Sequence, residues 1–113
     1  MRYMSFSATT EQVRNRTKTV TRRQGWLFLN RGDIVQPVVK AQGLKKGERV
    51  VKIGGPIRIK SNRRVGLDRI TKRDCIKEGF PNHSPREFVR MYCRLNGCTE
   101  WGNVSRIEFE YVD

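Results

Sequence analysis

The clearest pattern of apolar and polar positions lies near the end of the chain. In "NVSRIEFEYV" (103–112) apolar Ile107, Phe109 and Tyr111 alternate with charged Arg106 and Glu108. A period of two is typical of a β-strand with one buried face. The pattern therefore predicts a strand here, with its apolar side chains inward and its charged side chains outward.

Four other segments are rich in β-forming residues. They cover 3–8, 34–40, 49–53 and 57–61. Pro37 places the second of them at a sheet edge or a bulge, because proline donates no ladder hydrogen bond. The last two flank the turn "GGP" and predict a hairpin whose basic residues alternate outwards.

Polar residues ahead of apolar runs mark three helices. "SPRE" offers Ser84 as N-cap, Pro85 as the first helical residue and Glu87 to complete a capping box, and the helix should end at Gly97.

The two earlier helices are shorter. Thr9 and Gln12 form a second capping-box pattern, for a helix that ends near Asn15. Thr71 can cap the segment "KRDCIKE", with Gly79 as its stop.

These elements predict the fold class. Five or six short strands and two or three short helices, without repeats or linkers, suggest an α+β protein in which residues 1–113 form one domain. We expect a small, curved mixed β-barrel with helices packed on its side or end.

Charge adds a partner class. The formal net charge is +13, and residues 1–73 hold 19 basic against 4 acidic side chains. Such an excess costs self-repulsion unless a polyanion relieves it, so nucleic acid is the leading candidate. No apolar run is long enough to span a bilayer and no basic amphipathic helix is visible, so a membrane partner is not expected.

Cysteine usage and the first residues suggest a location. "MRYMSFSATTEQ" has no apolar core of signal-peptide length, and three cysteines suit a disulfide framework poorly, so we expect a cytoplasmic protein. Cys75, Cys93, Cys98 and His83 could in number form a zinc site, but their spacing is loose. Ordinary thiols and a surface histidine are the preferred interpretation, and neither a metal nor a cofactor is expected.

The stretch "NRTKTVTRR" (15–23) concentrates candidate chemistry. In a regular strand Lys18 and Thr21 would point to opposite faces. In a turn or a short helical segment they would come together. Both arrangements remain open from the sequence.

The same stretch carries a family resemblance. "TKTVTRRQGW", followed by "RGD", "RIT", "KEGFP" and "RIEFEYV", resembles an ASCH domain, in particular the small single-domain ASCH proteins of bacteriophages and bacteria. The likeness runs from about Ser5 to Val112. It implies a PUA-like β-barrel, a fold that typically serves RNA recognition and modification.

One branch of the ASCH family removes the acetyl group from N(4)-acetylcytidine, and its motif is similar here. The resemblance assigns a catalytic role to Lys18, Thr21 and Glu78. Thr21 would be the nucleophile, Lys18 the base, and Glu78 would handle the proton or hold the cytosine amine. Arginines near Lys18 would favour its neutral form, whereas Glu78 would oppose that.

Binding without catalysis is the leading hypothesis, and the amidohydrolase is its alternative. Because the fold that the resemblance implies typically serves RNA recognition, RNA is favoured over DNA. A basic groove for RNA or a modified nucleoside would be lined by Arg16, Lys18, Arg22, Arg23, Trp26, Lys45, Lys46, Lys60, Arg63 and Arg64. Trp26 would either stack a base or pack in the core, as would Phe28. A third hypothesis is a phage-type accessory protein that binds an acidic host protein.

Other enzyme classes find no support. The chain has no Walker-type glycine loop, no G-x-S-x-G elbow and no carboxylate cluster for Mg²⁺. A two-histidine ribonuclease is excluded because His83 is the only histidine.

Overall fold

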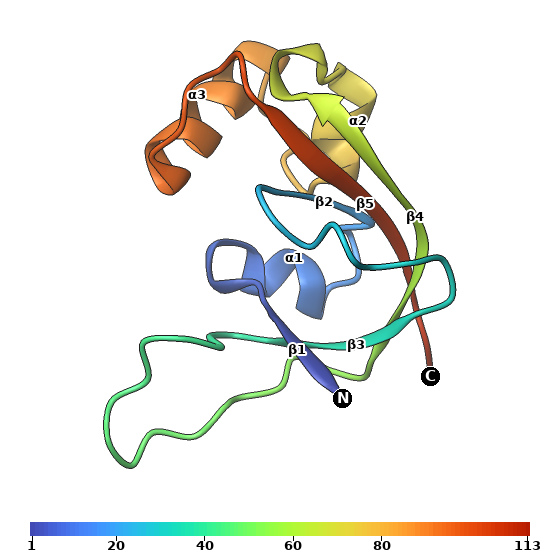
Figure 1. Ribbon diagram of the computed structural model, residues 1–113, viewed down its shortest axis with the longest axis vertical. Coiled ribbons are helices and arrows are strands. Elements are labelled where there is room, and N and C mark those ends of the chain that lie inside the picture. The colour runs from blue at the N-terminus through green and yellow to red at the C-terminus, as the bar shows by residue number, and fades with distance from the viewer.

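The computed structural model describes residues 1–113 and is an α+β fold, as predicted, with five strands in one mixed sheet and three α-helices. Figure 1 shows α2 and α3 at one end of the long β4–β5 ribbon, and α1 on the concave side of the curved sheet. In chain order the elements are β1 (Arg2–Ser5), η1 (Ser7–Thr9), α1 (Thr10–Arg14), β2 (Val20–Arg23), β3 (Ile34–Val38), β4 (Ile57–Gly66), η2 (Leu67–Arg69), α2 (Lys72–Lys77), α3 (Pro85–Asn96) and β5 (Asn103–Tyr111).

The sheet is curved but is not a closed barrel. Its strand order is β1-β3-β4-β5-β2, with β1 and β3 parallel and the other pairs antiparallel. The edge strands β1 and β2 do not pair with each other, because the chain turns from β1 directly into η1. A side chain links them instead, since the Arg23 guanidinium donates to the Ser5 carbonyl at 2.6 Å.

The predicted hairpin of 49–53 with 57–61 is wrong. The first residues of β4, which the hairpin would need, pair with β3 on one side and with β5 on the other, so they leave no free edge for 49–53. That segment lies beside the end of β3 instead. Its Ile53 amide donates to the Pro37 carbonyl at 3.0 Å, and Lys52 forms an isolated antiparallel β-bridge with Val38.

Pro37 is also not at a sheet edge. β3 lies between β1 and β4, but only Ile34 and Val35 pair with β4. Pro37 lies beyond that pairing, so its missing N–H leaves no β4 ladder bond unmade.

The helix signals after residue 70 are confirmed. The Thr71 hydroxyl accepts from the Asp74 amide, Ser84 and Glu87 form the predicted capping box, and Gly97 closes α3 in the left-handed conformation. These caps satisfy amides and carbonyls that a helix end leaves unpaired.

The first helix begins differently from the prediction. Thr9 makes no side-chain cap, and the Gln12 amide donates instead to the Gly79 carbonyl at 3.3 Å. Gly79 has φ +95°, and a Cβ there would lie 2.7 Å from Gln12 Cγ. Only glycine fits both the backbone and this close approach, so α1 fixes the chain directly after Glu78.

Two apolar clusters form the core, and β5 contributes to both. Ile107 and Phe109 are buried as predicted, whereas Arg106, expected to point outward, is only 8% exposed. Arg106 is buried because Asp74 of α2 binds its guanidinium. The structure has no helix with both the length and the apolar character needed to cross a membrane.

Candidate active site

A cavity of about 280 Å³ lies between η1, β2, the end of α2 and α3. It brings together Lys18, Thr21 and Glu78, although Glu78 lies 60 residues after Lys18 in the chain. An aromatic and aliphatic wall faces these polar groups, formed by Phe6, Phe80, Phe88, Met91, Tyr92 and Leu95.

The polar wall resolves the question posed by the basic stretch. Lys18 precedes β2 in a turn after α1, where the amides of Thr17 and Lys18 both donate to the Gln12 carbonyl. Thr21 lies in β2 itself. The stretch is therefore part turn and part strand, and both side chains line the same cavity.

Lys18 and Glu78 form a buried ion pair. Lys18 Nζ donates to Glu78 Oε1 and to the Glu78 carbonyl, each at 2.8 Å, and both side chains are only 3% exposed. The Tyr111 hydroxyl donates to the Lys18 carbonyl at 2.5 Å and fixes the backbone behind the amine. Lys18 is therefore held in one position inside the protein.

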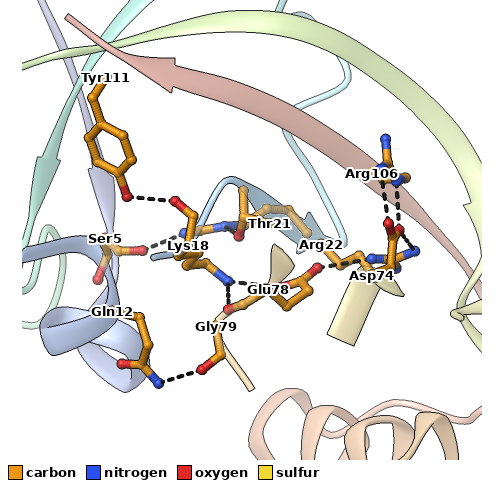
Figure 2. A network of polar contacts seen from close by, with 11 residues as sticks. Ser5, Gln12, Lys18, Thr21, Arg22, Asp74, Glu78, Gly79, Arg106 and Tyr111 are labelled. Carbon is orange, nitrogen blue, oxygen red and sulfur yellow. Dashed lines mark hydrogen bonds and ion pairs between the residues drawn. The ribbon is translucent and has the colours of Figure 1, made fainter. Parts of the chain in front are cut away.

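The pair continues into a longer network, which Figure 2 shows from Tyr111 to Arg106. Arg22 donates to Glu78 Oε2 at 3.1 Å and to Asp74 Oδ2 at 2.7 Å. Arg106 binds Asp74 through two hydrogen bonds, of 2.7 and 3.0 Å. Three cations and two carboxylates thus alternate along a network that joins β2 and the turn before it, α2 and its C-terminal end, and β5.

Burial and pairing change the proton affinities of this network. Desolvation is the main reason that the pKa of Lys18 lies below its usual value; Glu78 raises this pKa, while Arg23 and Arg22 lower it further. The hydrogen bonds from Arg106 and Arg22 hold the pKa of the Asp74 carboxyl well below its usual range, although burial opposes them. The lowered pKa of Lys18 favours the neutral amine that a general base requires.

Thr21 lies on the cavity wall beside Arg23. Its side chain is buried, it lines the cavity, and its hydroxyl oxygen accepts a hydrogen bond from Arg23 Nε at 3.1 Å. A hydroxyl that accepts this bond still carries its own proton, which a base can remove. Arg23 supplies positive charge beside the oxygen, and burial lowers its own pKa to about 10.

Several residues predicted to line a nucleic-acid groove lie elsewhere. Lys18 and Arg22 are inside the protein and are held by carboxylates. Trp26 is half-buried against the core, and its ring packs at a tilt against that of the exposed Phe28, with ring centres 5.4 Å apart. Arg16 is exposed and pairs with Asp113 at 2.5 Å.

Of the other predicted residues, Arg23 is half-buried and lines the first cavity, and five are exposed. Lys45 and Lys46 lie on the loop between β3 and β4, and Lys60, Arg63 and Arg64 lie on β4. They are available to a polyanion, but none of them lines the first cavity.

Sequence reasoning missed Asp74, Arg106 and Tyr92. The sequence predicts Asp74 only as a helical residue after the Thr71 cap. Strand alternation predicts that the Arg106 side chain points to solvent. Tyr92 lines the cavity with a buried hydroxyl that has no hydrogen-bond partner. Its position on the buried face of α3 is the one signal in the sequence that places it inward.

The cysteines do not gather around a metal site. Cys93 and Cys98 have their sulfur atoms 3.7 Å apart, while Cys75 is buried on α2. No group of three or more His, Cys, Asp or Glu side chains is placed to hold a metal ion.

Comparisons with family models, with curated proteins and with solved structures find no match to this chain. The chemistry of the cavity is thus the basis on which its function is inferred.

Proposed function

We propose that the protein is an ASCH-type domain, a variant of the PUA-like barrel, that hydrolyses the acetyl amide of N(4)-acetylcytidine. The observation that carries this proposal is the meeting of Lys18, Thr21 and Glu78 at one cavity with an apolar wall. These residues supply a nucleophile, a base and a proton carrier, the groups that amide hydrolysis requires.

The reaction would proceed through an acyl-threonine. The Thr21 oxygen attacks the acetyl carbonyl carbon while the neutral Lys18 amine takes the hydroxyl proton. The C–N bond then breaks, and the cytosine amine leaves with a proton from the Lys18–Glu78 pair. A water molecule hydrolyses the ester, which releases acetate and returns the proton to Thr21.

Arg23 suits the charge that develops in this step. Its Nε lies 3.1 Å from the Thr21 oxygen, so the guanidinium is close to the oxyanion of the tetrahedral intermediate. A positive donor already fixed in place stabilises such charge without reorganising. The Arg23 cation is held by the Ser5 carbonyl and by the face of Phe6, 4.7 Å from the ring centre.

The apolar wall provides space for a planar base. Phe88 and Tyr92 are stacked, with ring centres 6.2 Å apart. The Tyr92 hydroxyl, buried without a partner, is a donor that a base carbonyl would satisfy.

A second candidate function is binding of RNA without turnover. The excess of positive charge in residues 1–73 and the exposed basic side chains of β4 favour it. RNA binding would use the outer surface of the protein rather than the buried Lys18, Thr21 and Glu78.

The deciding experiment incubates the protein with N(4)-acetylcytidine and follows cytidine release. Thr21→Ala should reduce the rate by about 10³-fold or more, because the attacking atom is lost, while ligand affinity stays within a few-fold. Thr19→Ala is the matched control, since Thr19 belongs to the same motif but does not line this cavity, and its rate should stay near that of the wild type.

Two outcomes would count against hydrolysis. Deacetylation that survives in Thr21→Ala would exclude the nucleophile assignment. Complete absence of turnover in the wild-type protein would leave the cavity as a binding site and favour the second candidate.

A further inference from the structure

A second cavity, of about 260 Å³, is formed at the other end of the ion network. It shares Arg22 with the first cavity and is otherwise lined by different residues. Its charged groups are Arg22, Arg63, Arg69 and Arg106 against the single carboxylate of Asp74. Positive charge therefore exceeds negative charge in its wall.

The strand register explains why arginines meet here. Arg22 of β2 lies opposite Arg106 of β5, and Arg106 lies opposite Arg63 of β4, so three arginines form one row across adjacent strands. Residues directly opposite in a sheet project on the same face, and like charges in such pairs are unfavourable. The row is costly unless an anion lies against it.

Asp74 compensates only part of this row. It binds Arg22 and Arg106, which are buried. Arg63 is exposed and has no carboxylate partner, and neither has Arg69, which reaches the cavity from η2. Their guanidinium donors remain available to a ligand.

An unpartnered donor inside the protein points the same way. The Nε of Arg22 is buried and has no hydrogen-bond partner, although the Arg22 side chain is only 4% exposed. A buried donor without an acceptor is costly. Arg22 lines both cavities, and this cost adds to that of the arginine row.

We propose that this second cavity is a phosphate-binding site, in which Arg63 and Arg69 contact the phosphate oxygens. Arg106 and Arg22, fixed by Asp74, supply positive charge behind them. Guanidinium groups match the oxygen geometry of phosphate and form charge-assisted hydrogen bonds to it. A phosphate also carries enough negative charge to offset several arginines.

The phosphate belongs to a nucleotide chain, either as a terminal monoester or as an internal diester, which share this chemistry. Phosphate binding requires no reaction in the first cavity. Failure of deacetylation would therefore leave this proposal standing, and failure of phosphate binding would leave deacetylation standing.

The test compares two double variants that remove the same number and kind of charge. Arg63→Gln with Arg69→Gln alters the second cavity, while Arg90→Gln with Arg94→Gln removes two exposed arginines of α3 that line neither the first nor the second cavity. The probe is inorganic phosphate, titrated at about 0.15 M ionic strength, where the screening length is roughly 8 Å, and followed by NMR of the protein.

The first double variant should weaken phosphate binding by about ten-fold or more, because charge-assisted hydrogen bonds are lost. The α3 double variant should stay within about two-fold of the wild type, as screened surface charges act weakly at a distance. Equal weakening in both variants, or no saturable binding to the wild type, would overturn the proposal. A thermal melt of each variant verifies that it is folded.

A second arm identifies the source of the phosphate. It uses one short RNA oligonucleotide with either a 5′-phosphate or a 5′-hydroxyl end. If the Arg63 and Arg69 changes weaken only the phosphorylated form, the site takes a terminal phosphate; if they weaken both forms alike, it takes a backbone diester. If they weaken neither form, nucleotide phosphate is not the ligand and the proposal fails.

Discussion

The two cavities lie at opposite ends of one ion network. They differ in whether their cations have hydrogen-bond partners within the protein. In the first, the cations Lys18 and Arg22 both bind the carboxylate of Glu78, and these groups are almost completely buried. In the second, Arg63 and Arg69 face open space, and Asp74 is the only carboxylate in the wall. Each cation of the first cavity has an acceptor in the protein, since Arg23 donates to the Ser5 carbonyl, whereas two arginines of the second cavity have none.

The difference shows that burial determines whether a basic side chain must be paired within the protein or can remain available to a ligand. Ions inside a protein must be paired, because an isolated buried charge is too costly. Pairing fixes their positions and changes their proton affinities, which suits chemistry. Ions at the surface can remain unpaired at little cost because water solvates them, which suits the capture of an anion.

The largest expected effect on stability comes from removing the buried carboxylate of the first cavity. Glu78→Gln leaves Lys18 and Arg22 without the carboxylate that both contact. Removing one partner of a buried ion pair typically costs about 3–5 kcal/mol. The free energy of unfolding, measured by denaturant titration, should therefore fall by about that amount.

A surface pair provides the control for this change. Arg58 and Glu110 form an ion pair at 3.1 Å, with side chains 46% and 48% exposed. Because water screens such pairs, Glu110→Gln should cost at most about 1 kcal/mol. Equal losses for Glu78→Gln and Glu110→Gln would mean that burial does not distinguish the two pairs.

A smaller effect is expected at Asp74, where the two cavities meet. Asp74→Asn weakens three charge-assisted hydrogen bonds from Arg22 and Arg106. Arg22 keeps Glu78 and Arg106 keeps Glu108, so the loss at pH 7 should be about 2 kcal/mol. Asp68→Asn, at an exposed aspartate of η2, is the control and should leave the unfolding free energy nearly unchanged.

The stability that Asp74 contributes should depend on pH. The pKa of Asp74 in the folded protein lies below its usual value of 3.8, because Arg106 and Arg22 stabilise the carboxylate. Its contribution is therefore complete above that value and is lost as the pH falls below it. The difference between the wild type and Asp74→Asn should stay constant from neutral pH to about pH 5 and shrink below about pH 4. A difference that does not shrink in acid would contradict the assignment.

Local signals in the sequence predicted the helices better than the sheet. Ser84, Pro85 and Glu87 act within a few residues of each other, so α3 could be placed from its capping box alone. The hairpin of 49–53 with 57–61 failed because strand pairing depends on which partner is longer and more apolar. That competition involves β5, which begins more than 40 residues after β4 does.

The candidate site shows the same division. Lys18, Thr21 and Glu78 came from a family motif, and the structure places them at one cavity. The arginine row could not be predicted, because it depends on the register that sets Arg106 opposite both Arg22 and Arg63. Alternation placed Arg106 outside the protein, and its burial requires Asp74 of a separate helix.

The smallest expected effect on stability comes from removing an unpaired arginine of the second cavity. Arg63→Gln removes one like charge directly opposite Arg106 and should raise the unfolding free energy by up to about 0.5 kcal/mol at low salt. At about 1 M NaCl, where the screening length is roughly 3 Å, the gain should vanish. Lys60→Gln is the control on the same strand, since Lys60 lies at the bulge without a cross-strand partner, and it should show no gain. If Arg63→Gln destabilised the ligand-free protein, Arg63 would contribute to the fold, whereas a salt-sensitive gain would mark a charge kept at a cost in stability, as binding residues often are.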